Sequence, residues 1–197
     1  VGVAASGMGL PKDVFASVNR LWADGKAFVP GLAKAGDFIN QKGRDMLVAG
    51  YPVGWWADKF GLPLCINYAP DICGNIRAFK EIFRKYYPRA EIRYAAKANS
   101  HPAILSIARK EDIGADVASE NEMRCALQAK VDAKNIDVNG NCKTEDLIEM
   151  ALGKHMLLVA DSIEEFLIIS ELAKRHKKKP RVILRLAGYD LTKVTDE

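Results

Sequence analysis

The sequence predicts an α/β fold, specifically the start of a (β/α)8 TIM barrel, of which about the first five β/α units are present. From about residue 61, short apolar segments alternate with amphipathic ones, and the expected strands begin 21 to 25 residues apart. Continuously apolar strands alternating with helices indicate a parallel sheet covered by helices. Right-handed crossovers at so short a period suit a barrel. The alternative is a doubly wound open sheet, which usually carries a glycine-rich loop after its first strand; Ala-Ala-Lys-Ala-Asn-Ser is not such a loop.

The barrel part is expected to span residues 61–197, and the elements within it follow from hydrophobic periodicity. Five strands are expected at residues 92–96, 115–118, 136–139, 157–160 and 182–186. Helices are expected at residues 102–110, 120–129, 144–152 and 162–177. Thr144 and Ser162 are each followed by acidic residues, as is typical of a helix start.

Residues 1–60 are expected to form an N-terminal extension. Apolar spacing predicts a helix at 13–22 and a second short helix at 37–43. The Trp55-Trp56 pair is interpreted as a packing anchor between the extension and the domain. After the extension, residues 64–68 are expected to form a short strand, and a helix is expected to start at Asp71 or Asn75 and to end before Pro88.

Composition narrows the class of protein. The 197 residues are 49% hydrophobic and 27% charged, with a net charge of +4, which is ordinary for a globular protein. The basic run Lys174-Arg-His-Lys-Lys-Lys-Pro-Arg181 is interpreted as the solvated end of a helix rather than a nucleic-acid site. No stretch approaches the ~20 apolar residues that span a bilayer. The four cysteines have no zinc spacing, so we expect reduced thiols, no metal site and a cytoplasmic protein.

Each expected strand carries a polar side chain at or near its carboxyl end or is followed by one, and barrels carry their functional residues at these strand ends. These polar residues are Lys97, Asp116, Asn139, Asp161 and Arg185. An ammonium at the end of a buried strand is expensive to desolvate, and one use of such a lysine is to lose its proton and attack a carbonyl. A rim with a lysine, a carboxylate, an arginine and several amide and hydroxyl groups suits an anionic aldehyde cofactor, and pyridoxal 5'-phosphate is the obvious candidate.

These segments resemble the fold-type III pyridoxal-phosphate enzymes, and most of all the ornithine/diaminopimelate/arginine decarboxylase family. Tyr94-Ala-Ala-Lys-Ala-Asn-Ser-His-Pro-Ala-Ile-Leu105 is similar to the lysine signature of that family, and Gly114-Ala-Asp-Val-Ala-Ser-Glu-Asn-Glu-Met123 to its next block. Three further segments follow in family order: Asn139-Gly-Asn-Cys-Lys143, Val159-Ala-Asp-Ser-Ile-Glu-Glu-Phe166 and Val182-Ile-Leu-Arg-Leu186. The resemblance implies the barrel of the alanine racemase/decarboxylase type.

The resemblance also implies roles. Lys97 would be catalytic and form a Schiff base with pyridoxal phosphate. Asp116, Ser119 and Arg185 would bind the cofactor, and Glu122 would support the same wall of the site as Ser119. His101 matches no family role and is left structural. The implied reaction is decarboxylation of diaminopimelate or a basic amino acid such as ornithine or arginine. The alternatives are a non-catalytic homologue with a binding or regulatory role and an isomerase like alanine racemase.

Family members are considerably longer than this chain, and five strands cannot close an eight-stranded barrel. The expected partners are therefore an amino-acid substrate and the remainder of the barrel with a C-terminal β-domain, supplied by the same gene or by a second chain. The family also implies a homodimer. Neither nucleic acid nor a membrane is an expected partner. The 197-residue chain alone is expected neither to hold pyridoxal phosphate tightly nor to turn over substrate.

Overall fold

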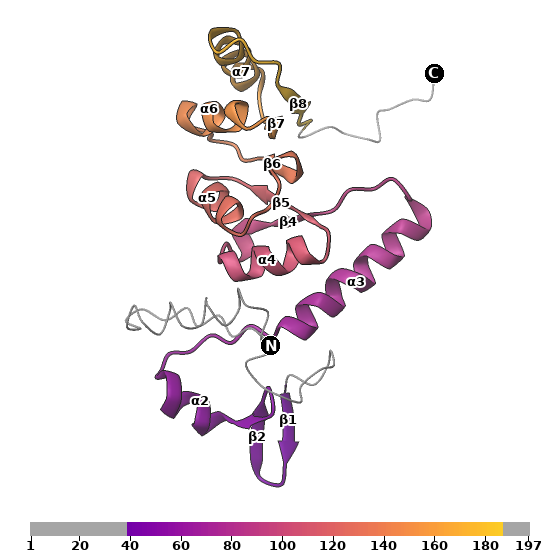
Figure 1. Cartoon of the computed structure of the whole chain (residues 1–197), viewed down its shortest axis with the longest axis vertical. Helices are drawn as coiled ribbons and strands as arrows, with labels where there is room; N and C mark the ends of the chain where they lie inside the picture. Colours follow the sequence, from indigo (N-terminus) through magenta and orange to yellow (C-terminus); the bar gives the residue numbers. More distant parts are fainter. Residues whose placement is uncertain (1–38, 187–197) are drawn as a thin grey trace. The chain divides into compact units, whose positions relative to one another are not determined.

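The computed structural model describes residues 39–186 (Figure 1). The chain divides into two compact units, one formed by Val1–Ile92 with His101–Asp112 and the other by Arg93–Ser100 with Ile113–Glu197. We call them unit 1 and unit 2. The helix expected at 13–22 and the residues after 186 lie outside the described part.

Unit 1 contains an antiparallel sheet where the sequence analysis expected a helix. β1 (Ile39–Lys42) pairs with β2 (Asp45–Val48), and β2 pairs with β3 (Tyr51–Pro52). Gly43 adopts φ +64° at the reversal between β1 and β2, a conformation that glycine reaches without steric cost. The helix expected at 37–43 is wrong because this turn folds the short segment back onto a pairing partner.

The tryptophan pair packs within unit 1, as expected of an anchor. α2 (Val53–Phe60) buries Trp56, which is 2% exposed and clusters with Ala49 and Tyr68. Its indole Nε1 donates a hydrogen bond to the carbonyl oxygen of Val48 at 2.7 Å. The cluster therefore ties the hairpin to the segment that leads into the next helix.

That segment is not a strand. Residues 64–68 form no ladder with any other described residue, so the strand expected there is wrong, and they run directly into α3 (Ala69–Tyr86). The helix begins earlier than expected because proline is tolerated in the first helical turn. α4 (Pro102–Lys110) has the expected bounds, and Glu111 just after it accepts two hydrogen bonds from Arg77 of α3 at 2.7 and 2.6 Å.

Unit 2 is a five-stranded parallel sheet in which every strand pairs with its neighbour in the sequence (Figure 1). This confirms the expected parallel α/β arrangement, and the unreversed order agrees with part of a barrel. The strands are β4 (Arg93–Ala95), β5 (Gly114–Val117), β6 (Ile136–Val138), β7 (Leu157–Ala160) and β8 (Arg181–Leu184).

The three described α-helices of unit 2 begin at side-chain caps. They are α5 (Glu120–Gln128), α6 (Glu145–Gly153) and α7 (Ile163–Arg175), with the short 3-10 helices η1 (Ala96–Ala98) and η2 (Ala133–Asn135). Ser119, Thr144 and Ser162 each accept a hydrogen bond from the amide three residues later. Such caps satisfy backbone donors that a helix start leaves unpaired.

The two faces of the sheet differ sharply in polarity. Figure 1 shows α5, α6 and α7 on one side of the strands. On β5, β6 and β7, the side chains that face these helices are at most 1% exposed: Ala115, Val117, Ile136, Val138, Leu158 and Ala160. Because side chains alternate along a strand, the opposite face carries Arg93, Asp116 and Asp137. At β4, β5 and β6, the face of the sheet that points away from the helices is therefore charged. We call it the charged face.

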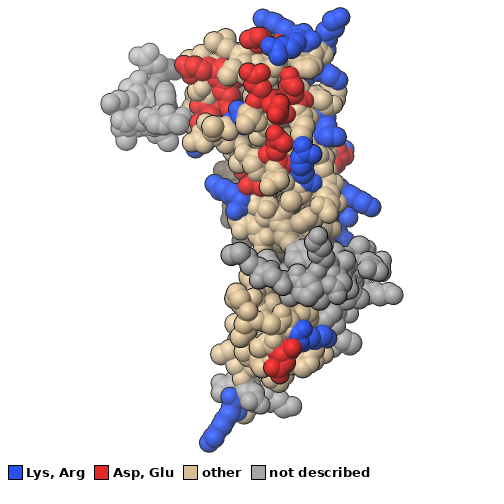
Figure 2. Space-filling view, turned by 90° about the vertical axis from the view of Figure 1, so that its left-hand side faces the viewer, with Lys and Arg blue, Asp and Glu red and all other residues tan. Residues whose placement is uncertain are grey.

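Charges are mixed on the helix-covered side. Figure 2 shows acidic side chains gathered over these helices, with basic side chains at the upper end of the view. The basic run starts in the last turn of α7, where Arg175 pairs with Glu171 at 3.1 Å and His176 with Glu149 at 2.9 Å. This agrees with a solvated helix end. Among the described helices, none has the length and apolar character needed to cross a membrane.

Candidate active site

Lys97 lies at the carboxyl end of β4, but not inside the strand. The strand ends at Ala95, and Lys97 is the middle residue of η1. Its side chain is exposed, so the expectation of a lysine closing a buried strand is wrong for the described chain. The tyrosine of β4 fixes this turn, because the Tyr94 hydroxyl donates to the Asn99 carbonyl oxygen at 3.3 Å. An exposed amine on an ordered turn is free to meet a carbonyl compound.

Asp116 is the carboxylate next to this lysine. It lies on β5, whose register with β4 places it opposite Ala95. Its Oδ1 atom is buried and has no hydrogen-bond partner among the described residues. Burial raises the pKa of Asp116, and the charges of Asp137 and Glu122 raise it further, whereas a hydrogen bond from Asn139 and the charge of Lys97 lower it. A buried polar atom without a partner is costly, and such atoms occur where a ligand supplies the partner.

Ser119 and Glu122 form the cap of α5. The Ser119 hydroxyl accepts the Glu122 amide at 3.3 Å, and the Glu122 carboxylate accepts the Ala118 amide at 2.8 Å. These contacts are local, and they fix the turn that follows Asp116. The Ser119 hydroxyl keeps its own proton for donation to a ligand.

The turn after β6 contains a buried lysine that sequence reasoning did not single out. The Lys143 side chain is 0% exposed, although its backbone reaches solvent. Its Nζ lies 2.8 Å from Oε2 of Glu165 and donates to the Gly140 carbonyl at 2.5 Å. Gly140 adopts φ +121°, which favours glycine, and its amide donates to Asn139 Oδ1 at 2.8 Å. The signal in the sequence was a lysine just after an Asn-Gly turn, which also reads as an ordinary surface loop.

Arg185, which follows β8, forms an ion pair with the acidic residue that follows β7. Its Nη1 lies 2.9 Å from Oδ1 of Asp161, and its guanidinium remains half exposed. The amide of Asp161 donates to Glu165 at 2.8 Å, the same carboxylate that holds Lys143. The carboxyl ends of β6, β7 and β8 are therefore joined by one chain of polar contacts.

His101 has a capping role. Its Nδ1 accepts the Ala103 amide at 3.1 Å at the start of α4, and burial lowers the pKa of the ring. This agrees with the structural role assigned to it. Within residues 39–186, no cluster of three or more histidine, cysteine or acidic side chains is arranged to hold a metal ion.

A second ion pair missed by sequence reasoning lies on the charged face. Arg93 of β4 donates through Nε to Oδ1 of Asp137 on β6 at 3.1 Å, and the side chains are 13% and 20% exposed. The pair spans the intervening strand at Gly114. The alternation of side chains along β4 places Arg93 on this face. Its partner Asp137 lies 44 residues further along the chain on β6, so no local sequence pattern indicates the ion pair.

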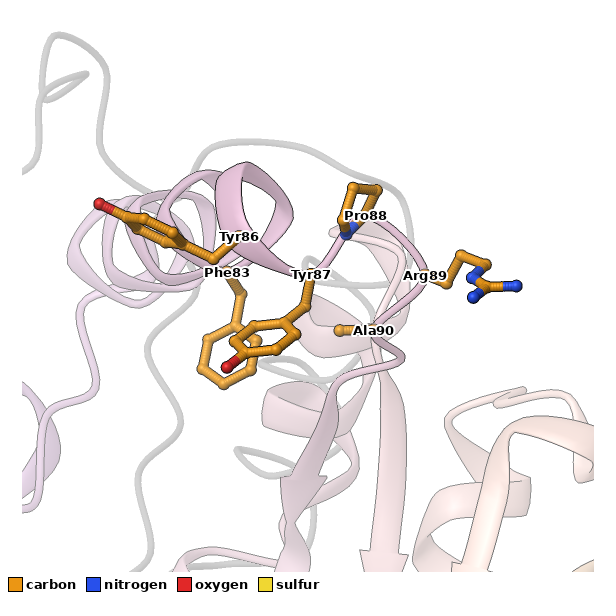
Figure 3. Close-up of a pocket in the computed structure, with 6 residues that line it drawn as sticks. All are labelled: Phe83, Tyr86, Tyr87, Pro88, Arg89 and Ala90. Carbon is orange, nitrogen blue, oxygen red and sulfur yellow. The ribbon is translucent and has the colours of Figure 1, made fainter.

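A surface pocket lies elsewhere in the sequence. Figure 3 shows it at the end of α3, lined by Phe83, Tyr86, Tyr87, Pro88, Arg89 and Ala90. The rings of Phe83 and Tyr87 lie side by side there, with centroids 5.9 Å apart. None of the site residues expected from the sequence contributes to it.

The residues around Lys97 fit an aldehyde cofactor in two respects. An accessible primary amine stands at a strand end, and an adjacent carboxylate has an unsatisfied buried oxygen. The guanidinium of Arg185 offers a further donor at the third strand along from Asp116. The fold places Lys97 directly after β4 and Asp116 on the adjacent strand β5, and the charge of Lys97 lowers the pKa of Asp116.

The chain is similar in sequence to proteins of one known family. The family model described as "Pyridoxal-dependent decarboxylase, pyridoxal binding domain" matches residues 73–195. A diaminopimelate decarboxylase of Methanocaldococcus jannaschii is 32% identical over 155 residues, which cover 76% of this chain and 35% of that protein. One from Bacillus subtilis is 30% identical over 149 residues, covering 75% of this chain and 34% of that protein.

Solved structures agree in fold. The crystal structure of the M. jannaschii enzyme superposes with a TM-score of 0.70 at 31% identity, covering 76% of this chain and 36% of the other. A lysine/ornithine decarboxylase from Vibrio vulnificus, at 21% identity and a TM-score of 0.53, shares the fold. The chain spans about a third of the length of the curated relatives it matches.

Proposed function

The chain belongs to the pyridoxal-dependent decarboxylase family, and on that premise we propose that it serves the pyridoxal-phosphate-dependent decarboxylation of an amino acid, with Lys97 as the residue that holds the cofactor. The observation that supports this most directly is the exposed Lys97 amine on the turn after β4, beside the incompletely hydrogen-bonded carboxylate of Asp116. We further propose that residues 61–197 form the barrel part and residues 1–60 the extension.

When bound, pyridoxal phosphate supplies an aldehyde and an electron-withdrawing ring that accepts the electron pair released as CO2 leaves an amino acid. The chain's residues have separate tasks around it. Lys97 Nζ is the nucleophile for the aldehyde, and the carboxylate of Asp116 on the adjacent strand orients the lysine side chain. Arg185, held by Asp161, offers N–H donors to an oxygen of the cofactor, and Ser119 offers its hydroxyl.

For the substrate we propose diaminopimelate, with a basic amino acid such as ornithine or arginine as the wider class. The relatives from M. jannaschii and B. subtilis, at 32% and 30% identity, are diaminopimelate decarboxylases, and the M. jannaschii enzyme was also solved in complex with L-lysine.

The outer edge of unit 2 supports a proposal that further chain completes the barrel. β8 ends the strand order and leaves Ile183 50% and Leu184 59% exposed. On α7, Ile163 and Leu167 are 76% and 60% exposed. An open edge beside apolar surface is a pairing site. We propose that further β/α units and a C-terminal β-domain cover it, from the same gene or a second chain, and that the whole enzyme is a homodimer in the cytoplasm.

Borohydride trapping tests the role of Lys97. The full-length protein, incubated with pyridoxal phosphate and reduced with borohydride, should carry one phosphopyridoxyl adduct on the peptide containing Lys97. Lys97→Arg keeps the charge but cannot be trapped, and Lys130→Arg, an exposed lysine after α5, serves as the matched control. Labelling spread evenly over surface lysines would contradict the proposal.

The same trapping experiment, together with an assay of the reaction, distinguishes two alternative functions. A binding or regulatory homologue gives no adduct at Lys97, whereas an isomerase gives the adduct but converts L- to D-amino acid without releasing CO2. The 197-residue chain by itself should show neither the visible absorbance of the bound cofactor nor turnover, because the five parallel strands of residues 39–186 do not close a barrel. Absorbance and turnover by the short chain would refute that expectation.

A further inference from the structure

The charged face of unit 2 holds two carboxylates side by side. β5 and β6 run parallel with Asp116 directly opposite Asp137, and Ala115 opposite Ile136 on the buried face. Neighbouring strands lie about 4.8 Å apart, so both carboxylates leave the same face at close range. Like charges this close disfavour simultaneous ionisation unless a cation compensates them.

Arg93 compensates one of the two. It starts on β4 opposite Gly114, and its Nε donates to Asp137 Oδ1 at 3.1 Å on the strand beyond. The route depends on Gly114, because a β-carbon there would lie 2.5 Å from Arg93 Cδ and 2.9 Å from Nε. Because Gly114 has no side chain, the Arg93 side chain can cross β5 at this position and reach Asp137.

The remaining carboxylate, Asp116, lies on the strand next to the one that Lys97 follows. Besides Asp137, the charged groups that act on Asp116 are Lys97 from η1 and Glu122 from α5, and Asn139 after β6 hydrogen-bonds to it. Burial and the two acidic neighbours raise the pKa of Asp116, and Lys97 with Asn139 opposes them. The charge of Asp137 therefore influences whether Asp116 is ionised. Only the ionised form of Asp116 attracts the Lys97 ammonium.

We propose that Arg93 and Asp137 are positioning residues for the Lys97 site: by holding the Asp137 carboxylate across Gly114, Arg93 leaves Asp116 as the carboxylate that engages Lys97. The importance of this for catalysis rests on the proposed function. The electrostatic arrangement itself involves only residues of unit 2 and exists without cofactor or substrate.

The test is the titration of Asp116 in the cofactor-free protein. With [4-13C]aspartate labelling, the Asp116 carboxyl resonance is identified by its loss in Asp116→Asn and followed from pH 2 to 9. Asp137→Asn removes a negative charge next to Asp116 and no longer neutralises Arg93, so the Asp116 midpoint should fall by about one pH unit. Arg93→Met exposes Asp116 to an uncompensated carboxylate, so its midpoint should rise by about the same amount.

The double variant Arg93→Met/Asp137→Asn removes a pair with no net charge, and its Asp116 midpoint should return close to that of the wild type. Opposite shifts in the two single variants cannot come from a merely structural pair, whose loss destabilises the fold in either variant. If Arg93→Met does not fold, Arg93→Lys keeps the charge and should leave the midpoint near the wild-type value, while the near-isosteric Asp137→Asn still tests the sign.

An unchanged Asp116 midpoint in Asp137→Asn, or shifts of the same sign in both single variants, overturns the proposal. Because no cofactor is present, this outcome is independent of the proposed function. Failure of Lys97 trapping with the expected Asp116 shifts refutes the decarboxylase role alone. Successful trapping with an unmoved Asp116 refutes the positioning role alone.

Discussion

Replacing Gly114 by alanine is expected to destabilise unit 2 strongly. A β-carbon at this position overlaps the backbone carbonyl oxygen of Asn135, in addition to its 2.5 Å approach to Arg93 Cδ. A side chain could rotate away from the overlap, but the backbone of Asn135 is fixed by the turn of η2 and by the β5–β6 ladder. Relief requires the two strands to separate or Arg93 to leave Asp137.

The magnitude follows from these two effects. Overpacking against a rigid neighbour costs typically about 1–3 kcal/mol. Displacing Arg93 adds the cost of a largely buried carboxylate with a weakened partner, so the sum for Gly114→Ala is about 2–4 kcal/mol. For a protein of this size, each kcal/mol lowers the melting temperature by about 2–4 °C, so a fall of about 10 °C is expected.

Gly153→Ala is the matched control. Gly153 is the last residue of α6, and a β-carbon there meets nothing within 4 Å. Alanine in a helix is favoured over glycine by about 0.5–1 kcal/mol, so the control should melt about 2 °C higher than the wild type. Thermal melts followed by circular dichroism compare the three proteins. A Gly114→Ala melting temperature equal to or above that of the wild type would refute the reasoning.

Two further predictions concern buried polar groups. Lys143→Met leaves the Glu165 carboxylate, which is 12% exposed, without its cation and should lower the free energy of unfolding by about 2–3 kcal/mol in urea titrations. The control Glu171→Gln removes an exposed ion pair and should change the free energy of unfolding by less than about 0.5 kcal/mol. Equal effects of the two substitutions would contradict the burial of the Lys143–Glu165 pair. Burial lowers the pKa of His101 in the folded protein, so the unfolded chain takes up its proton first and stability should fall as the pH drops below the ordinary value of 6.5. His101→Asn can cap α4 without titrating and should flatten that part of the stability–pH curve; an unaltered curve would show that another group is responsible.

Local pattern was enough for much of the fold. α4 begins at Pro102 and ends at Lys110 as the periodicity predicts, because proline favours the first helical turn and the apolar stripe ends there. The number and parallel order of the strands in unit 2 also follow from their spacing, because a short right-handed crossover leaves each strand beside its predecessor. Strand ends varied by one or two residues, as ladder partners rather than residue types decide them.

By itself, the sequence determined that a lysine and a carboxylate occupy consecutive strand ends, because chain order in a parallel sheet fixes which termini are neighbours. It could not reveal that residues 39–42 pair as a strand, that residues 64–68 remain unpaired, or that Lys143 is buried on Glu165. These features depend on partners distant in the sequence, and so does the passage of Arg93 over Gly114 to Asp137. Side-chain burial and long-range charge pairing are properties of the packed chain, and only the tertiary structure decided them.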